Sequence, residues 1–419
     1  MRRVLIALAL LFLPLAPAGA GDHAYCHQAS GAEAAGNYDL AIDYYTRCLK
    51  SVDLSIGNQA IFYNNRGEVY YRKGEYDRAI ADYDQALRLD PDYAGVYNNR
   101  GLAYLNTGEY DRAIANYDQA LRLDPEFAFA YNGRGSVYIR KGKYDRAIAD
   151  IDQALRLNPD FALAYNNRGS AYFHKGEYDR AIADYDRAIE YLYDLEEIRK
   201  AWPYNGRGSV YYRKGAYDRA IADFDQALRL DPDYALAYNG RGNAYTGKGE
   251  HDRAIADFDQ ALRLDPDYAS VYNDRGRTHF YRGRFAHAVP DLRRAVAADP
   301  EDAYRVLWLY LAQARAGQGG RAELGDNARR LDLSDWPGSL VRMFLGELDA
   351  QAVAGMGEAN RTRQDKERRA EAYFYVGQQR LMAGHTDNAA AFFRAVVKTG
   401  ITNFIEYIDA KAELKRLGQ

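Results

Sequence analysis

The stretch "AIFYNNRGEVYYRKGEYDRAIADYDQALRLDPDY", from Ala60 to Tyr93, decides the fold because the chain repeats it. Each copy carries a glycine at its eighth position, and these glycines lie 34 residues apart except for one step of 39 residues. They are Gly67, Gly101, Gly135, Gly169, Gly208, Gly242 and Gly276. A fixed period of this length predicts a repeat array, in which one structural unit is stacked many times.

Each copy predicts two helices, with positions counted from the residue that corresponds to Ala60. Aromatic and small residues recur at intervals of three and four, which places them on one stripe of a helix with 3.6 residues per turn. The stripes contain Tyr63, Arg66, Gly67 and Tyr70 in the first helix, and Ala79, Tyr83 and Ala86 in the second. Gly74 favours the backbone conformation that ends a helix, and Pro91 prevents the second helix from continuing. Neither helix buries its stripe alone, so the units must stack.

This pattern resembles the tetratricopeptide repeat, which has the same period and the same order of aromatic, small and proline positions. The resemblance covers residues 60–302 in seven copies. It implies an all-α fold, a right-handed superhelix (α-solenoid) of antiparallel helix pairs. It also implies a scaffold or adaptor that binds segments of other proteins, without a cofactor.

Charge and motif content argue against two other classes of protein. The formal net charge is −3, and both signs are mixed along the chain, whereas nucleic-acid binding needs a concentrated basic surface. Glycine-rich stretches at Gly242–Gly249, Gly133 and Gly206 imitate nucleotide-binding loops, but they fall at repeat positions, and Gly249 replaces the Ser or Thr of a phosphate-binding loop. The histidines are scattered, and the aspartates recur too often to form a catalytic pair. We therefore expect no enzyme.

Residues 1–20 predict a secretory signal peptide. They begin with "MRR", continue with an apolar run too short to span a bilayer, and end with small residues at Ala18 and Ala20. We expect cleavage after Ala20 and a mature protein that is periplasmic or secreted by a bacterium. An uncleaved anchor is the alternative. No later segment is apolar enough to predict a membrane span.

The two cysteines, Cys26 and Cys48, predict a disulfide, because an even number of cysteines in an exported protein favours pairing. The repeat register extends backwards into residues 21–59 and places Cys48 at position 27, near the start of the antiparallel helix that carries Cys26. The bridge would then staple a degenerate N-terminal helix pair. The alternative is a zinc or copper site formed by His23, Cys26 and His27.

Residues 303–419 predict an irregular helical module. "WPGSLVRMFLGELDAQAV" predicts a turn and a helix, "EAYFYVGQQRLMAGHTDNAAAFFRAVV" restores the repeat spacing, and "NFIEYIDAKAELKRL" predicts a closing amphipathic helix. In this order they resemble the C-terminal half of NlpI-like periplasmic proteins, which are tetratricopeptide-repeat lipoproteins. The resemblance implies a non-enzymatic adaptor that docks peptidoglycan hydrolases and a protease. This sequence departs from that family by lacking a lipidated cysteine and by having more regular repeats.

A binding groove is implied by the repeat family, in which positions 2, 5, 9, 12 and 13 of the first helices line the inner wall. Position 5 is asparagine in every copy: Asn64, Asn98, Asn132, Asn166, Asn205, Asn239 and Asn273. The other groove positions include Phe129, Leu163, Trp202 and Leu236 at position 2, Tyr71, Phe173, Tyr212 and Phe280 at position 12, and Arg72, Arg140 and Arg213 at position 13. Amides can pair with a peptide backbone, apolar groups supply burial and arginines favour carboxylates. We predict that the groove binds extended peptide segments or helices.

Two alternatives to peptide binding stay open for these residues. The asparagines can satisfy helix ends or the neighbouring unit, and the apolar groups at position 12 can pack between units. Aromatic, amide and guanidinium groups can also bind a glycan such as peptidoglycan, either directly or as an accessory subunit of an envelope enzyme.

The arginine at position 7 has a structural prediction instead. It is Arg66, Arg100, Arg134, Arg168, Arg207, Arg241 and Arg275 in the seven copies. This position borders the buried stripe, so the charge needs partners. Aspartates at positions 23 and 25 of the second helix, such as Asp82 with Asp84 and Asp223 with Asp225, are the candidates. We expect these arginines to fix the register of the helices and to contact no ligand.

The repeat is irregular after Ala188, where five extra residues precede the next copy. We expect the second helix of this unit to be longer than the others. A set of apolar residues, Tyr191, Leu195, Ile198 and Trp202, is a candidate partner patch on this extension. The alternative is that the extension packs without binding a partner.

Overall fold

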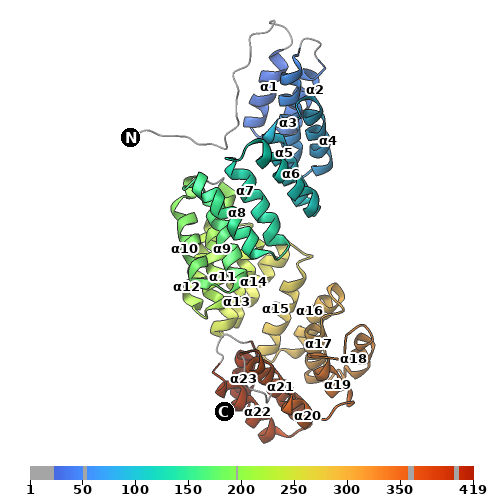
Figure 1. Ribbon diagram of the computed structural model, residues 1–419. Coiled ribbons are helices and arrows are strands. Elements are labelled where there is room, and N and C mark those ends of the chain that lie inside the picture. Colours follow the sequence, from blue (N-terminus) through green and yellow to red (C-terminus); the bar gives the residue numbers. More distant parts are fainter. Residues whose placement is uncertain (1–22, 51–53, 195–196, 357–362, 401–404) are drawn as a thin grey trace. The chain divides into compact units, whose positions relative to one another are not determined.

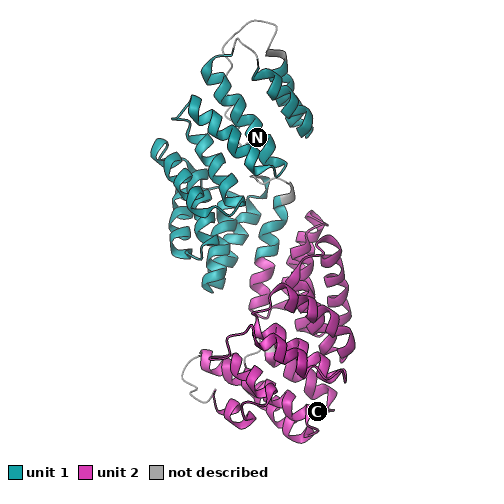
Figure 2. Ribbon diagram, turned by 90° about the vertical axis from the view of Figure 1, so that its right-hand side faces the viewer, with its two compact units in different colours: residues 1–206 teal, residues 207–419 magenta. Residues whose placement is uncertain are grey.

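The computed structural model describes residues 23–50, 54–194, 197–356, 363–400 and 405–419, and every regular element in these residues is a helix (Figure 1). The signal peptide predicted for residues 1–20 lies outside them. The chain divides into two compact units, residues 1–206 and residues 207–419 (Figure 2). In each unit, helices adjacent in the sequence pack as pairs, and the pairs stack on one another.

Unit 1 consists of helix pairs with a tight turn inside each pair. The pairs are α1 (His23–Ala34) with α2 (Tyr38–Cys48), α3 (Ile56–Arg72) with α4 (Tyr76–Leu89), α5 (Ala94–Asn106) with α6 (Tyr110–Leu123), α7 (Ala128–Arg140) with α8 (Tyr144–Leu157), and α9 (Ala162–Lys175) with α10 (Tyr178–Glu190). As predicted, Gly74 follows the end of α3 with a φ of +77°, and α4 ends before Pro91.

Unit 2 continues the pairs and ends in the C-terminal module, while α11 (Ala201–Arg213) begins in unit 1. The repeat helices are α12 (Tyr217–Leu230), α13 (Ala235–Lys248), α14 (His251–Leu264), α15 (Ala269–Tyr281) and α16 (Phe285–Ala298). The module consists of α17 (Ala303–Arg315), α18 (Arg321–Ala328), α19 (Gly338–Leu345), α20 (Ala350–Gly355), α21 (Arg363–Met382), α22 (Thr386–Lys398) and α23 (Ile405–Arg416). The stretch expected to form a turn and one helix forms two short helices, α19 and α20, because Gly346 ends the first with a φ of +74°.

The pair formed by α21 and α22 restores the repeat geometry, as the spacing predicted. A Cβ atom added at Gly377 of α21 would lie 2.6 Å from the ring of Phe393 on α22. The same constraint holds at Gly67, where a Cβ would lie 2.7 Å from the ring of Tyr83 and 3.2 Å from the carbonyl oxygen of Ala79. Glycine at position 8 therefore allows the two helices of a pair to approach closely.

The expectation of a longer second helix after Ala188 is wrong. α10 ends at Glu190, and the extra residues form two 3₁₀ turns, η1 (Leu192–Asp194) and η2 (Glu197–Lys200). The ring of Tyr191 stacks on Tyr165 of α9 at a centroid distance of 6.0 Å, which turns the chain back onto its own pair. Leu195 and the side chain of Ile198 lie outside the described residues, so the partner patch stays a prediction.

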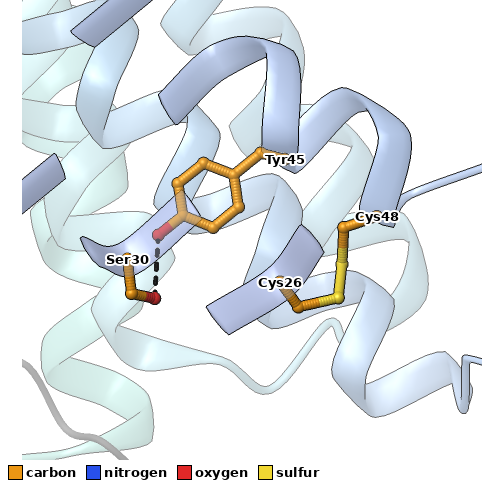
Figure 3. Close-up of a disulfide and its surroundings, with 4 residues drawn as sticks. All are labelled: Cys26, Ser30, Tyr45 and Cys48. Atoms are coloured by element: carbon orange, nitrogen blue, oxygen red, sulfur yellow. Dashed lines mark hydrogen bonds between the residues drawn. A yellow bond between two sulfur atoms is a disulfide. The ribbon is translucent and has the colours of Figure 1, made fainter. Parts of the chain in front are cut away.

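The predicted disulfide joins Cys26 of α1 to Cys48 of α2, with Cα atoms 5.3 Å apart (Figure 3). Beside it, the hydroxyl of Tyr45 donates to Glu33 at 2.9 Å and lies 3.4 Å from the hydroxyl of Ser30. Because the sulfur of Cys26 is bonded to Cys48, it is not free to serve as a thiolate ligand in the alternative metal site.

A half-buried ion-pair network connects neighbouring pairs within each unit. Arg168 donates from Nε and Nη2 to the two carboxylate oxygens of Asp184, at 2.8 and 2.7 Å. Its Nη1 donates to Asp152 at 2.6 Å. Asp184 is at position 23 of the same pair and Asp152 is at position 25 of the preceding pair, so one guanidinium joins two repeats. The same arrangement occurs at Arg134, Arg241 and Arg275.

The prediction that both aspartates come from one pair is wrong. Asp82 binds Arg66 through two hydrogen bonds of 2.7 Å, but Asp84 binds Arg100 of the next pair. Nη1 of Arg66 donates instead to the hydroxyl of Thr46 in the preceding pair, at 2.9 Å. Residues two positions apart on a helix point in nearly opposite directions, so positions 23 and 25 cannot face the same arginine. Asp223 and Asp225 divide in the same way between Arg207 and Arg241.

The tyrosine at position 4 covers the same guanidinium. The Cζ atom of Arg168 lies 5.5 Å from the ring centroid of Tyr165, one helical turn earlier. Comparable distances occur for Arg66 over Tyr63 and Arg241 over Tyr238. A cation over an aromatic face is stabilised, and the ring also keeps water from the ion pair. The recurring tyrosine and arginine of "YNNRG" therefore act together as a structural element.

We expect Arg168→Leu to lower the free energy of unfolding by about 3–5 kcal/mol, because Asp184 would stay buried without its countercharge. Burial raises the pKa of Asp184 above its ordinary value, and Arg168 opposes this effect. Urea unfolding followed by circular dichroism measures the loss. The matched control is Lys175→Met, which breaks an exposed ion pair with Asp145 and should lower the stability much less. Equal losses in the two variants would contradict the structural role of Arg168.

Replacing Cys26 and Cys48 by serine should remove about 3 kcal/mol from the stability of the first helix pair, since the bridge closes a segment with a sequence separation of 22. Hydrogen exchange should show faster opening of α1 and α2 and little change in α7 and α8. Reduction of the unmodified protein should reproduce the effect. Unchanged exchange in α1 and α2 would show that the bridge contributes nothing to their stability.

Candidate partner-binding face

The candidate site is the first-helix face, defined as positions 2, 5, 9, 12 and 13 of the first helix in each pair. Position 7 turns toward the second helix to make the ion pairs, so position 5, two residues earlier, lies on another side of the first helix. In unit 1 the face is carried by α3, α5, α7 and α9. In unit 2 it is carried by α13 and α15 and continues into the C-terminal module.

Two of the predicted asparagines connect neighbouring pairs. Asn64 and Asn132 are buried. Their carbonyl oxygens accept hydrogen bonds from the position 6 amides of the next pair, from Asn99 at 3.1 Å and from Asn167 at 2.9 Å. These contacts correspond to the structural alternative, in which position 5 satisfies the neighbouring unit. Asn64 and Asn132 therefore stabilise the stack.

Two other asparagines, Asn98 and Asn166, keep their carbonyl oxygens open. Both are half-buried, and each donates from Nδ2 only to the next residue, to Asn99 at 3.2 Å and to Asn167 at 3.5 Å. Among the described residues, none donates a hydrogen bond to their Oδ1 atoms, because the following pair has glycine at position 6. An open acceptor of this kind is suited to an incoming N–H group.

The glycine at position 6 leaves room for the ring that packs beneath it. A Cβ atom at Gly133 would lie 2.5 Å from the ring of Tyr117, and one at Gly206 would lie 2.4 Å from the ring of Tyr185. Both tyrosines are at position 24 of the preceding pair, where they fill the space between pairs. With glycine at position 6, the ring fills this space and no amide covers Asn98 or Asn166.

The three remaining asparagines are less accessible to a ligand. Asn205 is half-buried on α11. Nδ2 of Asn273 donates to Asp274 at 3.5 Å. The Oδ1 atoms of Asn239 and Asn273 are buried and have no hydrogen-bond partner among the described residues. A ligand could reach them only after neighbouring side chains move.

The apolar residues at position 2 differ in exposure. Phe129 is 40% exposed, and its ring contacts Phe161 at a centroid distance of 4.9 Å. Leu236 is 51% exposed. Trp202 is half-buried with Arg199 over its ring, at 5.4 Å from Cζ to the centroid. Phe129 and Leu236 therefore present the open apolar surface of this face, one in each unit.

The aromatic residues at position 12 pack within their own pairs. Tyr212 is half-buried and its ring lies 5.9 Å from Tyr217 at position 17, as Tyr71 lies 5.5 Å from Tyr76. These contacts favour the structural alternative for position 12. At position 13, Arg140 and Arg213 are exposed on the helix surface.

Phe280 does not lie on an open face, because the C-terminal helix covers it. Phe280 is 1% exposed, and its ring contacts Phe285 and Trp308 edge to face at 4.9 and 5.2 Å. Arg416 of α23 donates to the carbonyl oxygens of Phe280 and Tyr281 at 3.0 and 2.8 Å. The groove therefore closes at α15.

A buried cluster of charged groups lies under α23. Glu406 and Asp409 of α23 are 3% and 1% exposed, and Arg277 of α15 is 8% exposed. Arg277 Nη2 lies 3.5 Å from Asp409 and donates to Tyr281. Burial raises the pKa of Asp409 to about 7, with Arg277 and Tyr281 opposing and Glu413 adding to the shift. Burial also raises the pKa of Glu406 well above its ordinary value.

The groups around Glu406 come from two helices besides its own. Asp409 on α23 and Glu371 on α21 add to the raised pKa of Glu406, while Arg277 on α15 lowers it. Tyr375 of α21 is buried in the same place. Two carboxyl groups thus share one guanidinium, so the folded state favours their protonated forms.

Two sets of residues at this face are not indicated by the repeat pattern. One is position 6, which is asparagine, glycine or aspartate in different copies and decides in unit 1 which position 5 amides are open. The other is the acidic side of α23. Glu406, Asp409 and Glu413 are three and four residues apart, a spacing that places them on one side of a helix.

The sequences that imitate nucleotide-binding loops lie inside helices. Gly133 is in α7, Gly206 is in α11, and Gly242 begins a stretch within α13 that ends at the helix terminus. In the residues that the structure describes, no group of three or more histidine, cysteine, aspartate or glutamate side chains could hold a metal ion. The described helices also include none that is long and apolar enough to cross a membrane.

Stacked antiparallel helix pairs with a common first-helix face define a helical-repeat protein. Family models of the tetratricopeptide repeat together match more than half of the chain, over residues 67–108 and 208–249, 94–127 and 235–268, 116–149, 133–197, and 269–298. The chain belongs to the tetratricopeptide-repeat family. Proteins of this family serve as protein–protein interaction scaffolds.

One relative and several solved structures are similar to this chain. The lipoprotein NlpI homolog of Haemophilus influenzae is 33% identical over 120 residues, which is 28% of this chain and 38% of that protein. The chain therefore spans less than two fifths of that relative's length.

The solved structures show the shared fold. A tetratricopeptide-repeat protein from Parabacteroides merdae has a TM-score of 0.50 at 23% identity over 61% of this chain and 98% of its own. The Cut9–Hcn1 assembly has a TM-score of 0.56 at 20% identity, with 69% and 55% covered. The human IFIT1 dimer with m7Gppp-AAAA has a TM-score of 0.51 at 15% identity, with 92% and 91% covered.

We expect the buried carboxyl groups to make unfolding pH-dependent. In the unfolded chain they titrate near pH 4, but in the folded protein their pKa values are raised. The stabilising contribution of Asp409 is therefore fully present below about pH 4 and is lost as the pH rises through about 7, and that of Glu406 is likewise lost as the pH rises through its own raised pKa. Urea unfolding between pH 5 and 8 should show a decline that is smaller in Glu406→Gln. A stability difference between the two proteins that does not change with pH would contradict this expectation.

Proposed function

We propose that this protein is a non-enzymatic adaptor of the bacterial cell envelope, which holds extended segments or helices of other proteins on its first-helix face. The observation that carries the proposal is the pair of open amide acceptors in unit 1, at Asn98 and Asn166, on the same face as the exposed ring of Phe129. Backbone N–H groups of an extended segment can donate to such acceptors without requiring particular side chains.

The envelope location of the proposal rests on two further observations. Residues 1–20 have the pattern of a secretory signal, and a bridged cysteine pair is typical of exported proteins. The relative from Haemophilus influenzae is named as a lipoprotein. By the resemblance to NlpI-like proteins, the proposed clients are peptidoglycan hydrolases or an envelope protease.

A glycan-binding protein is the competing function for the same face. Exposed aromatic rings suit the apolar faces of sugars, and amides suit their hydroxyl groups. The open amides favour polypeptide instead, because an extended backbone supplies N–H donors in a regular array. Binding to isolated peptidoglycan that carries no protein separates the two functions.

The test compares two double variants that remove the same groups from different places. Asn98→Ala with Asn166→Ala should reduce crosslinked capture of envelope proteins roughly tenfold or more, because each lost hydrogen bond contributes about 1 kcal/mol. The thermal midpoint should stay near that of the unmodified protein. Asn64→Ala with Asn132→Ala should instead lower the thermal midpoint, because these amides connect neighbouring pairs.

Three results would contradict the proposed function. Unchanged capture by the Asn98 and Asn166 variant would show that the open amides are not used. Equal loss of capture in both double variants, in step with the loss of fold, would assign all four asparagines to structure. Strong binding of the unmodified protein to protein-free peptidoglycan, abolished in the Asn98 and Asn166 variant, would favour the glycan function.

A further inference from the structure

We propose that α23 is the resident occupant of a charged seat on α15, α17 and α21, and that a partner's amphipathic helix with two carboxylates one turn apart can take its place. The inference rests on the proposed function and specifies one class of partner for it, an amphipathic helix with two carboxylates. The seat is a separate part of the first-helix face from the open amides, since it lies in unit 2.

The seat is built from positions that the repeat family uses for binding. Arg277 is at position 9 of α15, and Arg315 is at position 13 of α17. Gln378 follows Gly377, the position 8 glycine of α21, and therefore is at position 9. All three meet α23, which packs against α15 and α21. This chain thus already holds a helix on its first-helix face.

One carboxylate of α23 fits the seat closely. Glu413 is 1% exposed, and its oxygens accept hydrogen bonds from Arg315 at 2.9 Å, Gln378 at 2.8 Å and Arg416 at 3.0 Å. Donors from three helices converge on one group. A carboxylate buried with this many charged and amide donors is well compensated for its loss of water.

The other carboxylates fit less well. Asp409, four residues before Glu413, lies 3.5 Å from Arg277 Nη2, and its Oδ1 has no hydrogen-bond partner among the described residues. Glu406, three residues before Asp409, lies on the same side of the helix. Among the described residues, its Oε2 atom and Nε of Arg277 also have no hydrogen-bond partner. Arg277 is the cation that faces both acids, so one acid is left without full compensation.

This misfit makes α23 a replaceable occupant. A helix that keeps acids at the places of Asp409 and Glu413, but has an uncharged residue at the place of Glu406, would meet Arg277, Arg315 and Gln378 without the uncompensated acid. Arg277 also lies over the ring of Trp308, at 4.7 Å to the centroid, so the seat retains its cation when the occupant changes. Charge and spacing therefore select an acidic helix with an i, i+4 pair.

The test uses the full-length protein and a fluorescein-labelled peptide of residues 405–419 that carries Glu406→Gln. Its anisotropy should rise on titration with protein. A control peptide that also carries Asp409→Asn and Glu413→Gln should bind about tenfold weaker or more, since two charge-assisted contacts are lost. Hydrogen exchange in the protein's own α23 should become faster when the first peptide binds, because that helix is displaced.

A chain variant gives a second measurement on a protein that retains the fold. Glu406→Gln in the full-length protein improves the fit of the resident helix, so it should weaken peptide binding several-fold and raise the thermal midpoint at pH 7.5. Lys175→Met, in unit 1, is the matched control and should leave peptide binding unchanged.

Three outcomes would contradict the proposal. The two peptides could bind equally, or the peptide could bind without faster exchange in α23. The Glu406→Gln chain could also bind the peptide as well as the unmodified chain does. Exchange of α23 between two copies, detected as a concentration-dependent dimer with no peptide binding, would assign the seat to self-association. The peptide could also fail to bind while client capture still depends on Asn98 and Asn166. That result would contradict the seat and leave the proposed function unaffected.

Discussion

The bidentate contact between the position 7 arginine and the position 23 aspartate is the interaction on which the array depends. A half-buried guanidinium needs several acceptors, and a single carboxylate occupies only two of its nitrogens. In this protein Arg168 takes a third acceptor, Asp152, from the preceding pair. The need to satisfy one cation thus becomes a link between repeats. Because the same link recurs at Arg134, Arg241 and Arg275, it fixes the register of neighbouring pairs within each unit.

This constraint also determines what the first-helix face can offer. Since position 7 is committed to the interior, the amide two residues earlier lies elsewhere on the helix, and position 6 decides whether that amide is covered. An asparagine there, such as Asn99 or Asn167, closes the acceptor of the preceding pair. A glycine at this position in unit 1 leaves the acceptor of Asn98 or Asn166 open, and the ring of Tyr117 or Tyr185 fills the space beneath the glycine. Core packing and surface chemistry are therefore set by the same choice of residue.

The sequence was sufficient for features that depend on local spacing. The period of 34 residues, Gly74, Pro91 and the two cysteines predicted the helix pairs and the disulfide, because each acts within one pair or one turn. It was insufficient where a side chain chooses between two neighbouring pairs, as Asp84 does, since helical spacing does not show which pair lies opposite. The sequence predicted the closing helix α23, but not its contact with Phe280 and Tyr281, because these residues are far apart in the chain.

The C-terminal module shows how the same positions change role when they are covered. In unit 1, position 5 offers neutral amides such as Asn98 and Asn166 beside the partly exposed Phe129, which suits a ligand with backbone donors. At α15, position 12 is the buried Phe280 and position 9 is the buried Arg277, which faces two acids of α23. A neutral open surface and a charged covered one select different partners, because only an opposite charge offsets the free energy lost when a charge is removed from water. Partner chemistry should therefore differ between the two units even though they share one repeat.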